Sequence, residues 1–92
     1  MTSAPQRAYK VKITNQTMAP RFTRGEIVIV DPDSPPKIGD DVFIPMEGGG
    51  LGRRLVALTA KTITLRQFRP RRDITIPRYG ATMHRIIFWG TA

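Results

Sequence analysis

Residues 24–32, Arg24-Gly25-Glu26-Ile27-Val28-Ile29-Val30-Asp31-Pro32, decide the fold class of this sequence. The centre of this stretch, residues 27–30, is an uninterrupted run of β-branched side chains. Such side chains have a restricted χ1 and fit a pleated sheet better than a helix. A continuous apolar run of this length predicts a strand that is buried on both faces. Gly25 before the run and Pro32 after it are typical of turns.

The rest of the chain repeats this arrangement of short strands and turns. Tyr9, Val11 and Ile13 alternate with polar residues, which predicts a half-buried strand. Pro45 limits the strand before it to a sheet edge or a strand end. Further strands are predicted at residues 41–44, 54–58, 62–66, 74–76 and 83–89.

The breaks between these strands are equally regular. A proline-rich segment at 31–36, a glycine tip at Gly48–Gly50 and a tight turn at 60–61 separate them, and residues 18–22 are the one helical candidate, of about one turn. The acidic residues beside Pro32 and Gly39 are expected to cap turns rather than to hold a cation. The sequence therefore predicts an all-β domain at residues 9–92, a small folded sheet or barrel of six or seven strands, after a flexible tail at residues 1–8.

Composition excludes several classes of function. The chain has 92 residues, no cysteine and a single histidine, His84, so a disulfide framework, a thiol nucleophile, a Ser-His-Asp triad and a Cys/His metal site lack their residues. We expect no metal and no cofactor. There is no apolar run of the ~20 residues that cross a bilayer, and residues 1–9 lack the apolar core of a signal peptide. A cytoplasmic protein without a membrane partner is predicted.

Several motifs resemble a known family when they are taken together. Thr-Met-Ala-Pro-Arg-Phe at 17–22 precedes the 24–32 run, and Lys-Ile-Gly-Asp-Asp-Val at 37–42, Leu-Gly-Arg-Arg-Leu-Val at 51–56 and His-Arg-Ile-Ile at 84–87 follow it. In order and spacing they are similar to the LexA-like peptidase domain of LexA, UmuD and related phage repressors, within the signal-peptidase-like superfamily. The resemblance spans about residues 11–89. It implies a β-clip fold and a role in a phage-repressor-type transcriptional regulator.

The resemblance also implies where a catalytic pair would lie. In that family a serine is the nucleophile and a lysine is its general base, and these positions correspond to Thr17 and Arg53. Arginine stays protonated at ordinary pH, so Arg53 cannot accept the proton of a hydroxyl, and the neighbouring Arg54 is no better. No glycine precedes Thr17, so the Ala-Gly or Cys-Gly bond that self-cleaving members cut is absent from residues 1–16. The motifs thus predict a pseudo-enzyme with no catalytic residue.

Other interpretations of the same residues remain open. Thr17 could act with an unconventional base in an active serine/threonine-type peptidase that cleaves itself or a peptide. The substrate cleft that the resemblance implies could instead persist as a peptide-binding groove, lined by Thr17 and the Gly48–Gly50 tip. For Arg53 we expect an ion pair with Glu26, Asp40 or Asp41.

Charge is distributed unevenly, which points to an anionic partner. The formal net charge is +8, and residues 1–50 carry as many acidic as basic groups, so the excess lies in residues 51–92. A stand-alone nucleic-acid-binding protein is therefore an alternative function. DNA contact is expected either through this basic half or through an N-terminal helix-turn-helix domain, which residues 1–92 do not contain. The candidate polyanion surface consists of Arg66, Arg69, Arg71, Arg72, Arg78 and Arg85.

The last strand offers a candidate dimer surface. Ile86, Ile87, Phe88 and Trp89 form an apolar run, and strict alternation would place Ile86 and Phe88 on one face and Ile87 and Trp89 on the other. One face belongs in the core, and the other is either covered by the same chain or free to associate. The family resemblance implies dimerisation through this region, so a homodimer is predicted.

Overall fold

The computed structural model describes residues 7–90, which form seven strands. All of them pair antiparallel in one sheet with the order β1-β2-β7-β3-β4-β5-β6. The all-β prediction is confirmed, and within the described residues the helical candidate is a single turn, closed by the Phe22 amide donating to the Met18 carbonyl over 3.1 Å. The strands are β1 (Tyr9–Lys12), β2 (Ile27–Asp31), β3 (Asp41–Met46), β4 (Gly49–Leu58), β5 (Thr62–Phe68), β6 (Arg71–Pro77) and β7 (His84–Gly90).

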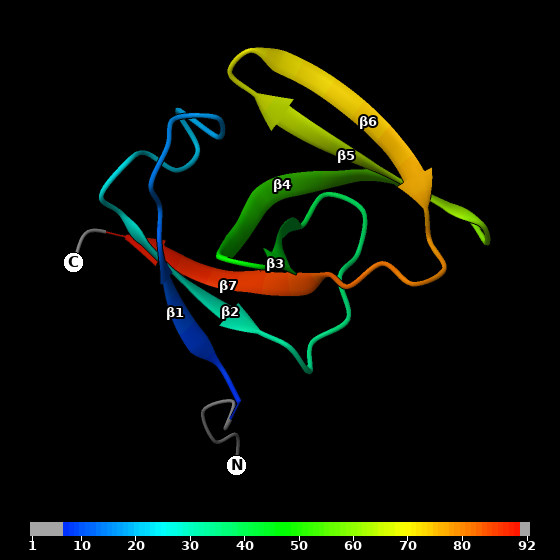
Figure 1. The fold of residues 1–92 in the computed structure, drawn as a ribbon, viewed down its shortest axis with the longest axis horizontal. Helices are drawn as coiled ribbons and strands as arrows, with labels where there is room; N and C mark the ends of the chain where they lie inside the picture. The colour runs from blue at the N-terminus through cyan, green and yellow to red at the C-terminus, as the bar shows by residue number, and fades with distance from the viewer. Residues whose placement is uncertain (1–6, 91–92) are drawn as a thin grey trace.

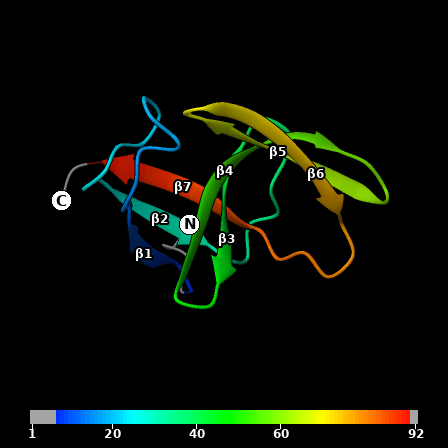
Figure 2. The ribbon, with the colours of Figure 1, turned by 45° about the horizontal axis from the view of Figure 1, so that its top comes forward.

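The sheet is folded over on itself rather than flat. β1, β2 and β7 form one part, and β4, β5 and β6 form the other, which rises over the first in both views (Figures 1 and 2). β4 joins the parts, because its first half pairs with β3 and its second half pairs with β5. A register shift between Leu55 and Ala57 marks a bulge in β4, a feature that bends a strand.

Each part of the sheet has its own buried cluster. The first contains Phe22, Val28, Val30 and Ile86, and the second contains Val42, Leu55, Ile63 and Leu65. The run that decides the fold was predicted to be buried on both faces, but only one face is: Val28 and Val30 are fully buried, while Ile27 and Ile29 are half-buried. The segment between β1 and β2, residues 13–26, lies beside the β5–β6 turn (Figure 1), and the Thr17 backbone joins the two.

β3, β4, β5 and β6 are all longer than predicted, β4 and β6 by the most, and one proline lies where expected. β4 begins at Gly49 and β6 begins at Arg71, because pairing with β3 and β5 extends them beyond their apolar residues. Pro45 lies past Phe43, the last β3 residue that pairs with β7, so its missing amide proton interrupts no ladder there.

The expected alternation in β7 is wrong. The register with β2 shifts between Ile29 and Val30, whose partners are Phe88 and Ile86, so Ile87 is an extra residue on β7. Ile86 is buried and Phe88 is exposed, although alternation put them on one face. Beyond the bulge, the Trp89 ring packs edge-on against the buried Phe22, with 5.5 Å between ring centroids.

Acidic side chains cap turns as predicted. Asp31 accepts from the Asp33 amide at 2.9 Å, and Asp40 accepts from the Lys37 amide at 2.8 Å. Most of the predicted tail at residues 1–8 lies outside the described residues. No helix within residues 7–90 is long and apolar enough to cross a membrane.

Candidate functional site

Thr17 lies in the turn that follows β1. The Asn15 side-chain oxygen accepts from the Thr17 amide at 3.1 Å and from the Thr17 hydroxyl at 2.7 Å. This is an Asx turn, in which an asparagine side chain replaces a backbone acceptor two residues before the donor. Met18 and Ala19, the next residues, are buried and anchor the turn to the core. The hydroxyl proton of Thr17 is therefore held by a neutral amide.

The Thr17 backbone joins this turn to the end of the β5–β6 hairpin. Its carbonyl oxygen accepts hydrogen bonds from the Phe68 and Arg69 amides, each at 2.9 Å. Two backbone donors on one acceptor fix the position of Thr17 independently of its side chain. Thr17 is consequently held between two segments that are about fifty residues apart in sequence.

Arg53 reaches the same place from β4. One terminal nitrogen, Nη1, donates to the Gly52 carbonyl at 2.7 Å and lies 3.4 Å from the Thr17 hydroxyl oxygen. The other, Nη2, donates to the Gln67 side-chain oxygen at 3.0 Å. The structure thus brings together the two residues that the sequence placed at the nucleophile and base positions.

The electrostatics of this pair do not favour nucleophilic chemistry. Partial burial lowers the pKa of Arg53, but a guanidinium titrates so far above neutral that it stays charged. A fixed cation beside the Thr17 oxygen accepts no proton from it. The only imidazole, His84, hydrogen-bonds through Nδ1 to the Tyr9 hydroxyl at 2.9 Å instead of facing Thr17.

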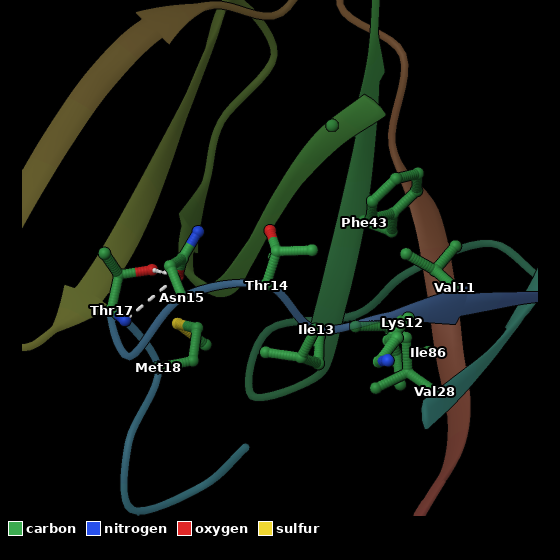
Figure 3. Close-up of a pocket in the computed structure, with 12 residues that line it drawn as sticks. Val11, Lys12, Ile13, Thr14, Asn15, Thr17, Met18, Val28, Phe43 and Ile86 are labelled. Carbon is green, nitrogen blue, oxygen red and sulfur yellow. Dashed lines mark hydrogen bonds between the residues drawn. The ribbon is translucent and has the colours of Figure 1, made fainter. Parts of the chain in front are cut away.

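A small pocket lies next to Thr17. Figure 3 shows residues of β1 and the following turn along one side, with Phe43, Val28 and Ile86 at the end away from Thr17. Lys12 also lines it, but its side chain is exposed and lies at the far end from Thr17 (Figure 3). Gly50 and Gly52 of β4 complete the lining, so part of the predicted glycine tip does border this pocket.

The expected ion pair of Arg53 is wrong. Asp41 is engaged by Arg21 at 2.8 Å and Arg54 at 3.3 Å, and Asp40 is engaged by Arg85 at 3.3 Å. Glu26 accepts from the Thr23 amide and hydroxyl, which lowers the pKa of its carboxyl. Among the ion pairs of residues 7–90, none includes Arg53.

The two amide side chains of this site, Asn15 and Gln67, were not among the predicted site residues. The Asn15 contact has a local signal, because asparagine two residues before a hydroxyl residue is typical of an Asx turn. Gln67 has none, since its contact with Arg53 depends on how β4 and β5 diverge beyond Arg54 and Arg66, their last paired residues.

The six arginines of the candidate polyanion surface are dispersed. Arg66 pairs with Asp73 through two contacts of 2.8 and 3.0 Å, and Arg85 pairs with Asp40 far along the sheet. Arg78 donates to the Thr59 carbonyl at 2.8 Å. The remaining three, Arg69, Arg71 and Arg72, are exposed and lie in or directly after the β5–β6 turn.

The candidate dimer residues divide between core and surface. Ile86 belongs to the first buried cluster, while Ile87, Phe88 and Trp89 are exposed by 38%, 60% and 36%. The Arg21 guanidinium lies 4.2 Å from the centre of the Trp89 ring, a cation–π contact. No group of acidic residues and His84 in the described part of the chain is arranged to hold a metal ion.

Comparison with known proteins shows the family of the chain. The family model of Peptidase S24-like proteins matches residues 1–87. The chain is 37% identical over 93 aligned residues to Repressor protein C of Rhizobium phage 16-3, covering 90% of this chain and 35% of that protein. No solved structure matches the chain. On the family match and this identity, the chain belongs to the Peptidase S24-like family.

Proposed function

We propose that this domain is a peptidase-inactive member of its family that serves as a dimerisation and regulatory module of a phage-repressor-type transcriptional regulator. The observation that carries the proposal is the Arg53 guanidinium, which lies 3.4 Å from the Thr17 hydroxyl oxygen where the family has a lysine base. The similarity to a phage repressor supports the regulatory role.

Inactivity is supported by the groups that surround Thr17 in the described part of the chain, none of which is a suitable base. Activation of a hydroxyl needs a nearby group that is neutral and basic near the working pH. Among the described residues, the Thr17 hydroxyl contacts the Asn15 side-chain amide and the Arg53 cation, and neither group has that property. The extra methyl group of threonine also restricts χ1 relative to serine.

Dimerisation is supported by the exposed part of β7. Ile87, Phe88 and Trp89 are adjacent large apolar residues on the surface of a small domain, and such groups are typical of protein–protein contacts. The dispersion of the arginines favours this role over direct DNA binding, since half of the proposed surface is engaged with Asp40, Asp73 or the Thr59 carbonyl. A duplex titrated across a salt series tests the DNA alternative, and tight binding at moderate salt would support it.

Inactivity is tested by incubating the purified chain at alkaline pH and following its intact mass. We expect no fragment from the wild type and none from Thr17→Ala. Fragments that form in the wild type and disappear in Thr17→Ala would refute the proposal, whereas fragments common to both would indicate a contaminating protease.

A further inference from the structure

The folded sheet leaves an apolar groove on the second part of the molecule. Its volume is about 260 Å³, and its lining is dominated by aliphatic side chains from four strands, with an arginine from β4 and another from β6. Ile44 and Leu51 come from the β3–β4 pair, and Leu65, Ile74 and Ile76 come from the β5–β6 pair. Ile74 remains 48% exposed, so part of this apolar surface faces solvent.

The groove borders the edge strand of the sheet. β6 is last in the strand order and, among the described residues, pairs only with β5 (Figures 1 and 2). Most of its residues are exposed. An edge strand carries unpaired backbone groups that a further extended segment is able to join.

Strand alternation sets which β6 side chains face the groove. Ile74 pairs across the sheet with Leu65, and Ile76 pairs with Ile63, both of which are buried. Arg72, Ile74 and Ile76 therefore share the groove face, and Asp73 lies on the opposite face with Arg66. A strand added beside β6 would direct every second side chain to this face.

The two arginines of the groove have no counter-ion among the described residues. Neither Arg53 nor Arg72 takes part in an ion pair of residues 7–90. Arg53 is partly buried, and its terminal nitrogens donate to the Gly52 carbonyl and the Gln67 side-chain oxygen, which are neutral acceptors and leave its charge without an anion among the described residues. The groove thus combines an apolar floor with positive charge, which is complementary to an apolar segment bearing a carboxylate.

We propose that this groove and the β6 edge bind an extended peptide segment of a partner protein, with alternate apolar side chains against Ile74 and Ile76 and an Asp or Glu carboxylate between Arg72 and Arg53. The segment joins β6 as an eighth strand. This proposal goes beyond dimerisation through β7 and involves a different surface. Each of the two proposals can therefore be refuted by experiment without affecting the other.

Other occupants fit the groove less well. A second copy pairing through its own β6 would bring Arg72, Ile74 and Ile76 to this face and no carboxylate, because Asp73 lies on the other side. A nucleic acid would supply anions but would leave its polar backbone against the apolar floor.

The test uses a fluorescein-labelled peptide of alternating valine and threonine with glutamate at both ends, so that either strand direction presents a carboxylate to the arginines. A matched peptide has glutamine in place of both glutamates. By fluorescence anisotropy we expect the wild-type chain to bind the glutamate peptide roughly tenfold more tightly than the glutamine peptide. We also expect amide hydrogen exchange in β6 to slow when it binds.

Three variants locate the site. Ile74→Ser should weaken the affinity for the glutamate peptide by roughly tenfold. Ile38→Ser, at a 61% exposed residue outside the groove, should leave binding unchanged and serves as the matched control. Arg72→Gln should remove most of the difference between the two peptides. Circular dichroism of each variant checks that it is folded.

Several results would overturn the proposal. They are failure of both peptides to bind the wild type, equal affinity for the two peptides, or equal weakening by Ile74→Ser and Ile38→Ser. Displacement of the peptide by a DNA duplex in an Arg72-dependent manner would assign the groove to nucleic acid. A change of oligomeric state in Ile74→Ser without peptide binding would assign it to a second copy.

Discussion

The guanidinium of Arg53 donates toward the hydroxyl oxygen of Thr17 across 3.4 Å, from a strand and a turn that are brought together by the fold of the sheet. The Thr17 carbonyl is meanwhile held by two amides of the β5–β6 hairpin. The two positions that the family resemblance predicted for a nucleophile and its base therefore lie beside each other, with a threonine and an arginine as their side chains. This arrangement makes the predicted roles testable by substitution at the two positions.

The first prediction is that Thr17→Ser combined with Arg53→Lys creates a reactive hydroxyl. A lysine that is partly buried in place of Arg53 is able to lose its proton near neutral pH, which an arginine does not do. We expect a fluorophosphonate probe to label the double variant, with a rate that rises with pH, and not the wild type. Labelling is read by intact mass.

Each single variant is the control for that experiment. Thr17→Ser keeps the cation, and Arg53→Lys keeps the hindered hydroxyl, so both should label far more slowly than the double variant. Labelling of the wild type at Thr17 to the same extent as the double variant would show that Arg53 does not suppress reactivity.

A second prediction concerns Asp41, a buried carboxylate of β3 that lies between two arginines. Its residue is 3% exposed, and its oxygens contact Arg21 and Arg54, whose guanidinium groups lie over the rings of Trp89 and Phe68. Asp41→Asn removes the charge and leaves two cations without their anion. We expect it to lower the free energy of unfolding by about 2 kcal/mol in urea titrations.

The matched control is Asp33→Asn, which breaks an exposed ion pair with Arg7. It should change stability by less than about 0.5 kcal/mol. The fluorescence of Trp89, the single tryptophan, should shift in Asp41→Asn as Arg21 is released and stay constant in the control. Equal losses of stability in the two variants would mean that the buried Asp41 contributes no more to stability than the exposed Asp33.

Local sequence was sufficient for the strands but not for their register. The run of β-branched residues at 27–30 and the alternation at 9–13 depend on neighbours in sequence, and both strands form as predicted. The bulge at Ile87 does not depend on sequence neighbours. It arises because β7 pairs with β2 on both sides of one extra residue. Strict alternation therefore misplaced Phe88.

The candidate site shows the same division between local and distant information. A family resemblance located Thr17 and Arg53, and the fold brings them together. The predicted ion-pair partner of Arg53 was wrong, because Gln67 contacts Arg53 from a diverging strand. Asp41 is already paired with Arg21 and Arg54. Which of several acidic residues meets a given arginine depends on packing that a sequence does not display.

A third prediction concerns the close approach of β4 to β3 at Gly50. A Cβ added there would overlap the Phe43 ring and lie 2.6 Å from the Ile44 carbonyl oxygen. Gly50→Ala should therefore lower the free energy of unfolding by about 1–3 kcal/mol, because the buried Phe43 must shift. Gly52→Ala is the matched control on the same strand, since its nearest contact is Met18 at 3.9 Å. Equal urea midpoints for both variants would contradict this account.

A fourth prediction tests the proposed dimer through β7. Phe88→Glu places a charge on a 60% exposed apolar residue and should convert a dimer to a monomer without unfolding it. Tyr79→Glu makes the same kind of change at a residue that is 98% exposed and lies between β6 and β7, so it should not alter assembly. Sedimentation velocity measures both. A wild-type chain that is monomeric at every concentration tested would refute dimerisation through this surface.

The last prediction uses the ion pair on the outer face of the β5–β6 hairpin. The hydrogen bonds from Arg66 are the main reason that the pKa of Asp73 is lowered, with a smaller contribution from the charge of Arg71. A carboxyl whose pKa is lower in the folded state stabilises the fold above its unfolded pKa, and this contribution is lost as pH falls through the folded value. Arg66→Gln should thus reduce the urea midpoint at neutral pH, and the difference from wild type should shrink in acid. In NMR titrations the pKa of Asp73 should rise in Arg66→Gln and rise less in Arg71→Gln. A midpoint difference that stays constant down to strongly acidic pH would mean that Arg66 acts by packing along the strand and not through the carboxylate.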